Sequence, residues 1–291
     1  MVLAAYAKIN LLLDILGKTE DGYHTVFNIM QSVDLADYVT VELDGAPGTI
    51  QLSCSNSSLP CNADNLAYAA AQHFLQETGI PNPGIRIFVE KHIPIAAGLA
   101  GGSADAAAVY VAMNHLLHAG LSERQLSTMA VATGADVPFC IQGGTMLGLY
   151  TGGVLAALPA VSPCWYVLCN PDQQISTKEA YAAFDTAQNV RHLNREGMLQ
   201  ALMTGNTEQQ FANMGNLFEQ LLEVPDRVEI KSVLRQHGAK VHLMSGSGPS
   251  TYGAFTEKAD AEACFHALKA AGYQRVFLCR PNAAGVEILP E

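Results

Sequence analysis

The most constraining stretch of this chain is Pro94–Ala108, PIAAGLAGGSADAAA, in which alanines and three glycines directly precede a helix-forming run. Gly98, Gly101 and Gly102 have no Cβ, so they can adopt positive φ and let backbone amides converge on one point. The helix behind them adds partial positive charge at its N-terminus. The segment is therefore either a phosphate-binding loop or a turn that packs closely against a sheet, and its glycine content alone does not decide between the two.

The loop does not match the two common nucleotide-binding motifs. It lacks the GxxxxGK[ST] pattern of a Walker A loop and the GxGxxG pattern of a dinucleotide-binding loop. Ser103 stands in the first turn of the predicted helix, where its hydroxyl can reach a phosphate oxygen or a bound cation. The net charge of −11 argues against nucleic acid or an anionic membrane surface as the main partner, but a cluster of amides binds phosphate without net positive charge.

Length and composition predict one large or two moderate folded domains, because 49% of the 291 residues are hydrophobic and only 15% are charged. The seven cysteines are scattered without a CxxC pair, which favours a reducing compartment over a disulfide framework or a metal site. The apolar N-terminal run has no basic region before it and is interrupted by Lys8, Asn10 and Asp14. We therefore expect no signal peptide, no membrane span and a cytoplasmic location.

The pattern of apolar residues predicts a mixed α+β order rather than a regular βαβ alternation. Asp64 is expected to cap the first helix, and Ser122-Glu123-Arg124-Gln125 forms a capping box for the third. In the first half, strands are predicted at 3–16 and 84–93, a hairpin pair at 38–43 and 49–55, and helices at 64–79, 102–118 and 122–133.

The second half of the chain returns to strand-like segments, and a domain boundary is predicted near Pro159–Pro163. Its strands are expected at 143–150, 154–158, 165–170, 240–244, 251–255 and 274–279, with helices over most of 177–237 and at 259–270. The strand at 274–279 is expected to be the last element.

Four other features have ordinary interpretations when each is taken alone. GSGPS, at 246–250, can be a second anion-binding loop or a tight turn. Asp136, in GADVPF, follows a helix and is typical of a cap or turn residue. Lys8 interrupts an apolar strand, either at an edge or as a deliberately placed cation. His24, in EDGYHT, follows a turn signal and is typical of an exposed loop.

Taken together and in order, AKINLLL, DGYH, PIAAGLAGGSADAAA, GADVPF and MSGSGPS resemble the superfamily of small-molecule kinases that includes galactokinase, homoserine kinase and mevalonate kinase, the GHMP kinases. The glycine loop is shared across that superfamily. AKINL, DGYH and GADVPF are more specific, and they resemble the members that use ATP to phosphorylate the 2-hydroxyl of 4-diphosphocytidyl-2-C-methyl-D-erythritol.

The resemblance implies an α+β, two-domain GHMP kinase fold with the active site between the domains. Residues 1–158 would form the ATP-binding domain, similar to domain 2 of ribosomal protein S5, and residues 159–291 a ferredoxin-like C-terminal domain. Asn65 would lie near the adenine. The residues that would surround the ATP phosphates are Pro94, Ile95, Ala96, Ala97, Gly98, Leu99, Ala100, Gly101, Gly102, Ser103 and Ala104.

The same resemblance implies roles for residues outside the loop. Lys8 and Asp136 would be the catalytic pair, with Asp136 accepting the proton of the attacking hydroxyl. Ser103 would contact the Mg²⁺ that accompanies ATP. The residues that would hold the substrate are Asn10, Tyr23 and His24 at the cytidine end, and Gly246, Ser247 and Gly248 near its phosphates.

Two departures from the pattern leave local roles open. The turn at 148–155, GLYTGGVL, has neither the Arg nor the Glu that relatives often carry there, and Ala104 replaces the second serine of the loop. A mevalonate- or homoserine-type kinase would share the loop, and a non-catalytic nucleotide- or sugar-binding sensor would share the fold but lack the types of Lys8 and Asp136. We expect a monomer or weak homodimer with no nucleic-acid or membrane partner.

Overall fold

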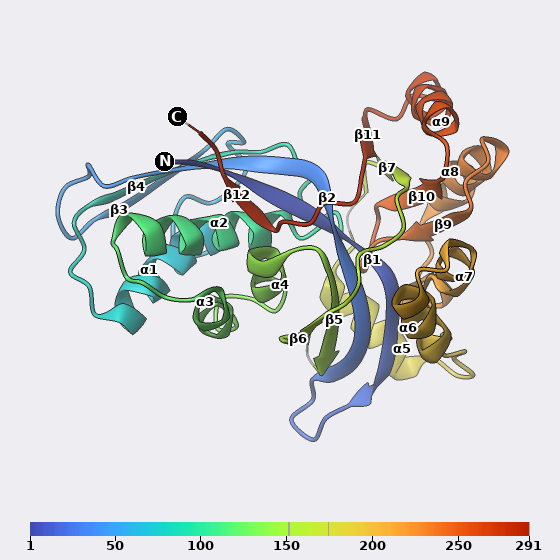
Figure 1. Cartoon of the computed structure of the whole chain (residues 1–291), viewed down its shortest axis with the longest axis horizontal. Coiled ribbons are helices and arrows are strands. Elements are labelled where there is room, and N and C mark those ends of the chain that lie inside the picture. The colour runs from blue at the N-terminus through green and yellow to red at the C-terminus, as the bar shows by residue number, and fades with distance from the viewer. Residues whose placement is uncertain (151, 174, 291) are drawn as a thin grey trace.

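The protein, described here by a computed structural model of residues 1–150, 152–173 and 175–290, contains two sheets that lie side by side (Figure 1). The larger sheet has eight strands and the path order β12-β1-β2-β4-β3, with β5 and β6 extending from β2 and β8 pairing with β1. Its strands are β1 (Val2–Lys18), β2 (His24–Glu42), β3 (Ile50–Cys54), β4 (Ile85–Glu90), β5 (Thr145–Tyr150), β6 (Val154–Ala157), β8 (Gly215–Asn216) and β12 (Val286–Ile288).

The long hairpin β1–β2 extends through both halves of the molecule (Figure 1). Nearly all of β1 is buried, as its apolar sequence predicts for a strand covered on both faces. Its register with β2 shifts between Tyr6 and Lys8 and again between Asn10 and Leu12. Irregularities of this kind bend a strand and re-aim its side chains. They occur on either side of Lys8, the one cation within the apolar run.

The predicted hairpin of 38–43 with 49–55 is wrong. β4 lies between the two segments, pairing antiparallel with β2 and parallel with β3, and the chain reaches β4 from β3 through a helix. The chain does turn after Leu43, but the turn leads it alongside the start of β4 rather than directly back onto β2. There Gly45 donates to Gly84, whose φ of +98° and lack of a Cβ permit the crossing. A turn motif identifies a bend, while the partner strand is decided by the whole apolar surface.

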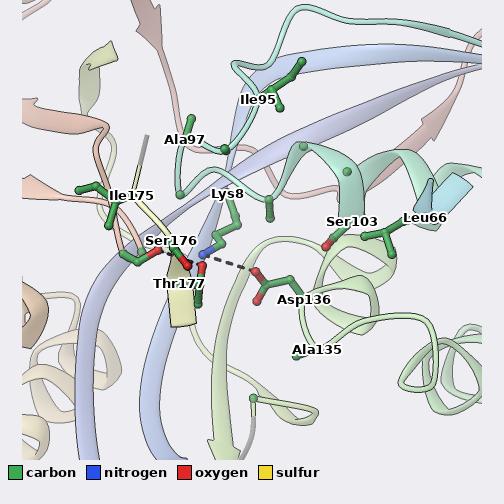
Figure 2. Close-up of a pocket in the computed structure, with 18 of the residues that line it drawn as sticks. Lys8, Leu66, Ile95, Ala97, Ser103, Ala135, Asp136, Ile175, Ser176 and Thr177 are labelled. Atoms are coloured by element: carbon green, nitrogen blue, oxygen red, sulfur yellow. Dashed lines mark hydrogen bonds and ion pairs between the residues drawn. The ribbon is translucent and has the colours of Figure 1, made fainter. Parts of the chain in front are cut away.

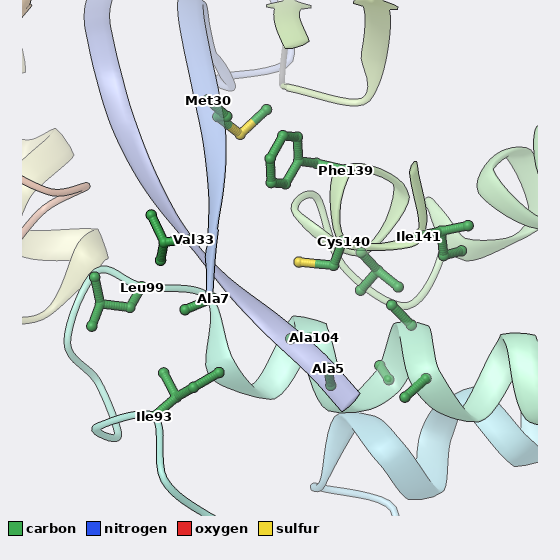
Figure 3. Packing of buried hydrophobic residues seen from close by; sticks show 14 of the residues in the cluster. Ala5, Ala7, Met30, Val33, Ile93, Leu99, Ala104, Phe139, Cys140 and Ile141 are labelled. Atoms are coloured by element: carbon green, nitrogen blue, oxygen red, sulfur yellow. The ribbon is translucent and has the colours of Figure 1, made fainter. Parts of the chain in front are cut away.

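Four helices cover one face of the larger sheet: α1 (Leu66–Thr78), α2 (Gly101–Leu116), α3 (Glu123–Ala130) and α4 (Val137–Gln142) (Figure 1). The cap of α1 is Asn65 rather than Asp64, because the Asn65 side chain accepts from the Ala67 amide. Ser122 and Gln125 form the predicted capping box of α3. The alanines of α2 allow close packing on β1, and Figure 3 shows Ala104 near Ala5 within the buried cluster.

The smaller sheet has the order β11-β7-β10-β9 with every pair antiparallel, and chain order gives it the β-α-β-β-α-β arrangement expected for a ferredoxin-like domain. Apolar residues of α8 and α9 pack on it. Its strands are β7 (Trp165–Asn170), β9 (Val241–Met244), β10 (Thr251–Phe255) and β11 (Arg275–Cys279). The second-half helices are α5 (Thr177–Thr186), α6 (Arg195–Thr204), α7 (Thr207–Asn213), η1 (Leu217–Gln220), α8 (Pro225–Gln236) and α9 (Lys258–Ala270).

Two short strands of the second half return to the larger sheet. β8 pairs with β1 in parallel, and β12, which follows the strand predicted to be last, pairs with the opposite end of β1. The Tyr252 hydroxyl also donates to the Asn10 carbonyl, and one apolar cluster includes residues of both sheets. The division at 158/159 stays a prediction, but the two halves share a continuous core. None of the helices within the described residues has both the length and the apolar character needed to cross a membrane.

Candidate active site

A cavity of about 1270 Å³ lies between the two halves of the molecule. Its walls come from β1, the β1–β2 turn, the loop before α1, the loop before α2, the starts of α4 and α5, and the loop between β9 and β10. Figure 2 shows Lys8 near its centre, with Ser103 and Asp136 to one side and Ser176 and Thr177 to the other. The volume is sufficient for a nucleotide and a second ligand together.

The loop before α2 adopts positive φ, but at different residues from those predicted. Ala96, Gly98 and Ala100 have φ of 52°, 74° and 58°, whereas Gly101 and Gly102 lie within the helix. A Cβ on Gly101 would meet the Ile93 side chain at 3.0 Å. The missing Cβ of Gly101 therefore serves the packing of α2, and only Gly98 has the left-handed glycine conformation that the sequence led us to expect at three positions.

Two glycine-rich loops cross at Gly98. A Cβ there would lie 2.1 Å from the Ser245 carbonyl oxygen, so only glycine permits this approach. The Ser245 hydroxyl donates to the Gly98 carbonyl over 2.9 Å, and the Asn216 amide donates to the Gly246 carbonyl over 2.8 Å. The segment Gly246–Gly248 is thereby held on the cavity wall. The second glycine motif is thus a loop tied to the first one rather than an isolated turn.

The first amides of α2 lie at the cavity and have no hydrogen-bond partner among the residues that the structure describes. Ala100 stands at the cap position in a left-handed conformation and offers no side-chain acceptor to the first turn. The first amides of an α-helix have no partner within the helix, and the helix dipole adds partial positive charge at that end. Gly101, Gly102 and Ser103 all line the cavity. The arrangement can bind an anionic group, in particular a phosphate.

Lys8 and Asp136, which are far apart in sequence, form an ion pair of 3.7 Å inside the cavity (Figure 2). The Lys8 residue is 5% exposed, and its backbone amide donates to the Leu99 carbonyl of the glycine loop. Asp136 occupies the cap position of α4 yet makes no side-chain cap hydrogen bond. Its carboxylate therefore faces Lys8 and the cavity rather than its own helix.

Asn10 lies beneath Lys8 and does not line the cavity. Its Oδ1 accepts from Lys8 Nζ over 2.9 Å and from the Gly246 amide over 2.7 Å, and its Nδ2 donates to Asn28 over 2.7 Å. This fully buried amide connects the cation to the second glycine loop. The contact with cytidine that the resemblance implies for Asn10 stays a prediction, and the observed bonds support a role in holding Lys8.

A second buried lysine on the same cavity wall was missed by the sequence analysis. Lys91 donates to both Asp37 and Asp105, and its side chain is 6% exposed. Asp105 Oδ1 has no partner among the described residues. Burial raises the pKa of the Asp105 carboxyl to about 7, against the opposing effect of the Lys91 ammonium. The signal in the sequence was a lone carboxylate in an alanine-rich helix.

Aromatic side chains gather at the β1–β2 turn, at the other end of the cavity. Tyr23 is 64% exposed, whereas the His24 ring stacks on Tyr181 with centroids 4.6 Å apart. His24 is therefore not the exposed loop residue of its ordinary interpretation. Tyr181 and Asp185, both on α5, were missed because nothing in a short amphipathic helix marks which of its side chains meets a distant turn. Ser247, from the second glycine loop, is within hydrogen-bond distance of Thr177 at 3.1 Å.

Most of the remaining predicted residues also lie on the cavity wall, but Leu99 and Ala104 do not, because both side chains are buried in the apolar core. The Asn65 side chain is occupied by its bonds to the Ala67 amide and the Pro60 carbonyl, so it shapes the wall rather than offering a free group. Ser103 lines the cavity on the first turn of α2. No group of three or more histidine, cysteine or acidic side chains in the described part of the chain is placed to hold a metal ion. In the variant turn, Thr151 lies outside the described residues, and Gly152 and Gly153 line the cavity.

Two family models match this chain. The model described as GHMP kinases N terminal domain matches residues 65–144, and that described as GHMP kinases C terminal matches residues 187–274. Together they cover more than half of the sequence, so the chain belongs to the GHMP kinase family. It is accordingly a phosphotransferase with an alcohol group as acceptor.

Curated relatives over nearly the full length are named 4-diphosphocytidyl-2-C-methyl-D-erythritol kinase. That of Caldicellulosiruptor bescii is 38% identical over 280 residues, covering 96% of this chain and 95% of the relative. That of Gloeobacter violaceus is 39% identical over 292 residues, covering 98% and 95%. A crystal structure of 4-(cytidine 5'-diphospho)-2C-methyl-D-erythritol kinase is 31% identical with a TM-score of 0.79, covering 97% of this chain and 100% of that one. A homoserine kinase from Cytophaga hutchinsonii, with a TM-score of 0.78 at 20% identity, shares the fold.

Proposed function

We propose that this kinase transfers the terminal phosphoryl group of ATP to the 2-hydroxyl of 4-diphosphocytidyl-2-C-methyl-D-erythritol, in the non-mevalonate isoprenoid precursor pathway. The names of the relatives give the substrate. The observation that carries the assignment of the site is the ion pair of Lys8 with Asp136, placed between the free amides of α2 and the aromatic cluster at the β1–β2 turn. A nucleotide and a cytidine-containing acceptor would meet at this pair.

The residues suit the needs of phosphoryl transfer, which depends on alignment and charge stabilisation more than on covalent chemistry. The amides of the loop and of the α2 N-terminus would hold the ATP phosphates. Asp136 would accept the proton of the attacking hydroxyl, and the Lys8 ammonium would stabilise the charge that develops beside it. Asn10 holds Lys8 in place from below.

The residues on this wall also fit a magnesium ion bound together with ATP. Mg²⁺ prefers oxygen ligands and keeps several waters, so one or two protein oxygens beside the phosphates are enough. The Ser103 hydroxyl lines the cavity at the start of α2, and the Asp136 carboxylate lies on the same side of Lys8 (Figure 2). We propose Ser103 as the protein ligand. When bound, the ion would neutralise phosphate charge.

We further propose that the enzyme acts in the cytoplasm, as a monomer or weak homodimer without nucleic-acid or membrane partners. The net charge of −11 supports the absence of polyanionic partners, and the seven free cysteines fit a reducing compartment. Fractionation and sedimentation measurements test both statements.

The substrate is tested by supplying the purified protein with ATP and, separately, the cytidine substrate, mevalonate or homoserine, while ADP release is followed. Turnover with the cytidine substrate alone is expected. Turnover only with mevalonate or homoserine would contradict the proposed acceptor but not the assignment to the kinase family. ATP binding without any turnover would favour the non-catalytic sensor. Asp136→Asn serves as the inactive control.

A further inference from the structure

Asp185 of α5 joins the two ends of the β1–β2 turn. Its Oδ2 accepts from Lys18 Nζ and its Oδ1 pairs with His24 Nε2, both over 2.7 Å. Lys18 is the last residue of β1 and His24 the first of β2. One carboxylate therefore ties both strand ends of the hairpin to a helix of the other half, at the end of the cavity where a cytidine would lie.

The His24 ring is held in its plane as well as at its edge. Tyr181 stacks on it, with rings 21° from parallel, and Phe184 meets it edge-on at a centroid distance of 5.9 Å. The His24 side chain is only 11% exposed. Because packing fixes the ring orientation, the main freedom left to the neutral ring is which nitrogen carries the hydrogen.

The Asp185 carboxylate determines which nitrogen of His24 carries the hydrogen. Hydrogen bonds from Lys18 and His24 lower the pKa of the Asp185 carboxyl, so it is ionised at neutral pH and can only accept. His24 Nε2 must then carry the hydrogen, which leaves Nδ1 of the neutral ring with a lone pair. Within the described part of the chain Nδ1 has no hydrogen-bond partner and is not buried, and His24 lines the cavity.

We propose that Asp185 is a positioning residue that locks His24 in the Nε2–H tautomer and thereby sets the base preference of the acceptor site. An Nδ1 lone pair accepts a hydrogen from the 4-amino group of cytosine and opposes the 4-carbonyl of uracil. This inference rests on the proposed function, since it concerns how a cytidine ligand is selected. Without the carboxylate, the ring can move its hydrogen to Nδ1 and donate to uracil instead.

The experiment compares the wild-type chain with Asp185→Ala and with Lys18→Ala, a matched control that removes the other partner of the same carboxylate but leaves the acceptor for His24. Calorimetry measures the binding of cytidine 5'-diphosphate and uridine 5'-diphosphate to each protein. A site that pairs a base polar group rejects the mismatched base by about two orders of magnitude or more. We expect Asp185→Ala to reduce the ratio of the two dissociation constants, uridine 5'-diphosphate over cytidine 5'-diphosphate, to less than about tenfold. Lys18→Ala should retain most of the wild-type ratio.

Steady-state kinetics distinguish a positioning role of Asp185 from a merely structural one. In Asp185→Ala the KM for the cytidine substrate should rise about tenfold or more, while kcat and the KM for ATP should change by less than about threefold. Equal weakening of both pyrimidine nucleotides, or an unchanged ratio, would overturn the tautomer proposal while leaving the proposed function intact. If the wild-type chain neither binds cytidine 5'-diphosphate nor turns over the cytidine substrate, both the tautomer proposal and the proposed function are contradicted.

Discussion

α2 and α3 begin in opposite ways. α3 starts at solvent with a complete capping box, in which Ser122 and Gln125 satisfy each other's backbone amides. α2 starts at the cavity behind Ala100, with no side-chain cap and a backbone held in a left-handed conformation. The difference indicates which helix start is available to a ligand. A helix that caps itself has used its free amides, and one that does not can offer them to phosphate.

α4 extends the comparison to chemistry. Asp136 is a residue type that normally caps a helix, and it stands at the cap position, but it makes no cap bond and pairs with Lys8 instead. A residue type that caps helices well here faces the cavity instead of its own helix. If this view of the two kinds of helix start is right, changes at α2 and α4 should alter catalysis, and changes at α3 should alter only stability.

The largest effect is expected from Asp136→Asn. The amide cannot accept the hydroxyl proton, so kcat should fall by about two to four orders of magnitude while ATP affinity changes little. Asp136 contributes no cap bond, so the loss of unfolding free energy should come from the broken ion pair with the buried Lys8 and amount to about 1 kcal/mol. Steady-state kinetics and thermal unfolding measure the two. Unaltered turnover would remove Asp136 from the role of base.

The next effect is expected at the crossing of the glycine loops. Gly98→Ala places a Cβ 2.1 Å from the Ser245 carbonyl oxygen at a φ of +74°, so the loops must separate. We expect a loss of about 2 to 4 kcal/mol in stability together with a higher KM for ATP. Gly102→Ala is the matched control for stability, because its Cβ would meet nothing closer than 3.7 Å and its backbone is helical. Equal unfolding curves for the two variants would contradict this account of the loop.

Ser122→Ala tests the self-capped side of the comparison. Removal of the capping box should cost about 1 kcal/mol of unfolding free energy. kcat and both KM values should remain at the wild-type level, because α3 begins away from the cavity. Chemical denaturation measures the first and the ADP-release assay the second. A kinetic defect without a loss of stability would show that α3 is coupled to the site.

The last prediction concerns the pH dependence of stability. The Asp105 pKa is raised by burial to about 7, so between about pH 4 and 7 the folded state binds more protons than the unfolded chain. Stability contributed by this group is therefore present at low pH and is lost as the pH rises through 7. Asp105→Asn should remove that loss. The variant should gain stability relative to wild type as the pH rises from 5 to 8, measured by denaturation at each pH, and a constant difference would contradict the raised pKa.

Much of the local structure could be predicted from the sequence, because caps, turns and apolar periodicity act over a few residues. The capping box at Ser122 and the start of α2 were found in this way. Strand partners were not, since β4 enters between two segments that looked like a hairpin and β12 returns to β1 from the end of the chain. Glycine content identified the loop but not its φ angles, because Gly101 and Gly102 lie within α2, where the missing Cβ of Gly101 makes room for Ile93.

The sequence by itself determined the chemical types at the site: a lysine in an apolar strand, an aspartate at a helix start and a glycine loop without a cap. Only the tertiary structure decided that Lys8 lies 3.7 Å from Asp136, that Asn10 is buried beneath them, and that Asp185 reaches His24. The reason is physical. Residue type and local conformation depend on neighbours in the chain, whereas these contacts join segments that meet only when the two sheets bury apolar residues in one continuous core.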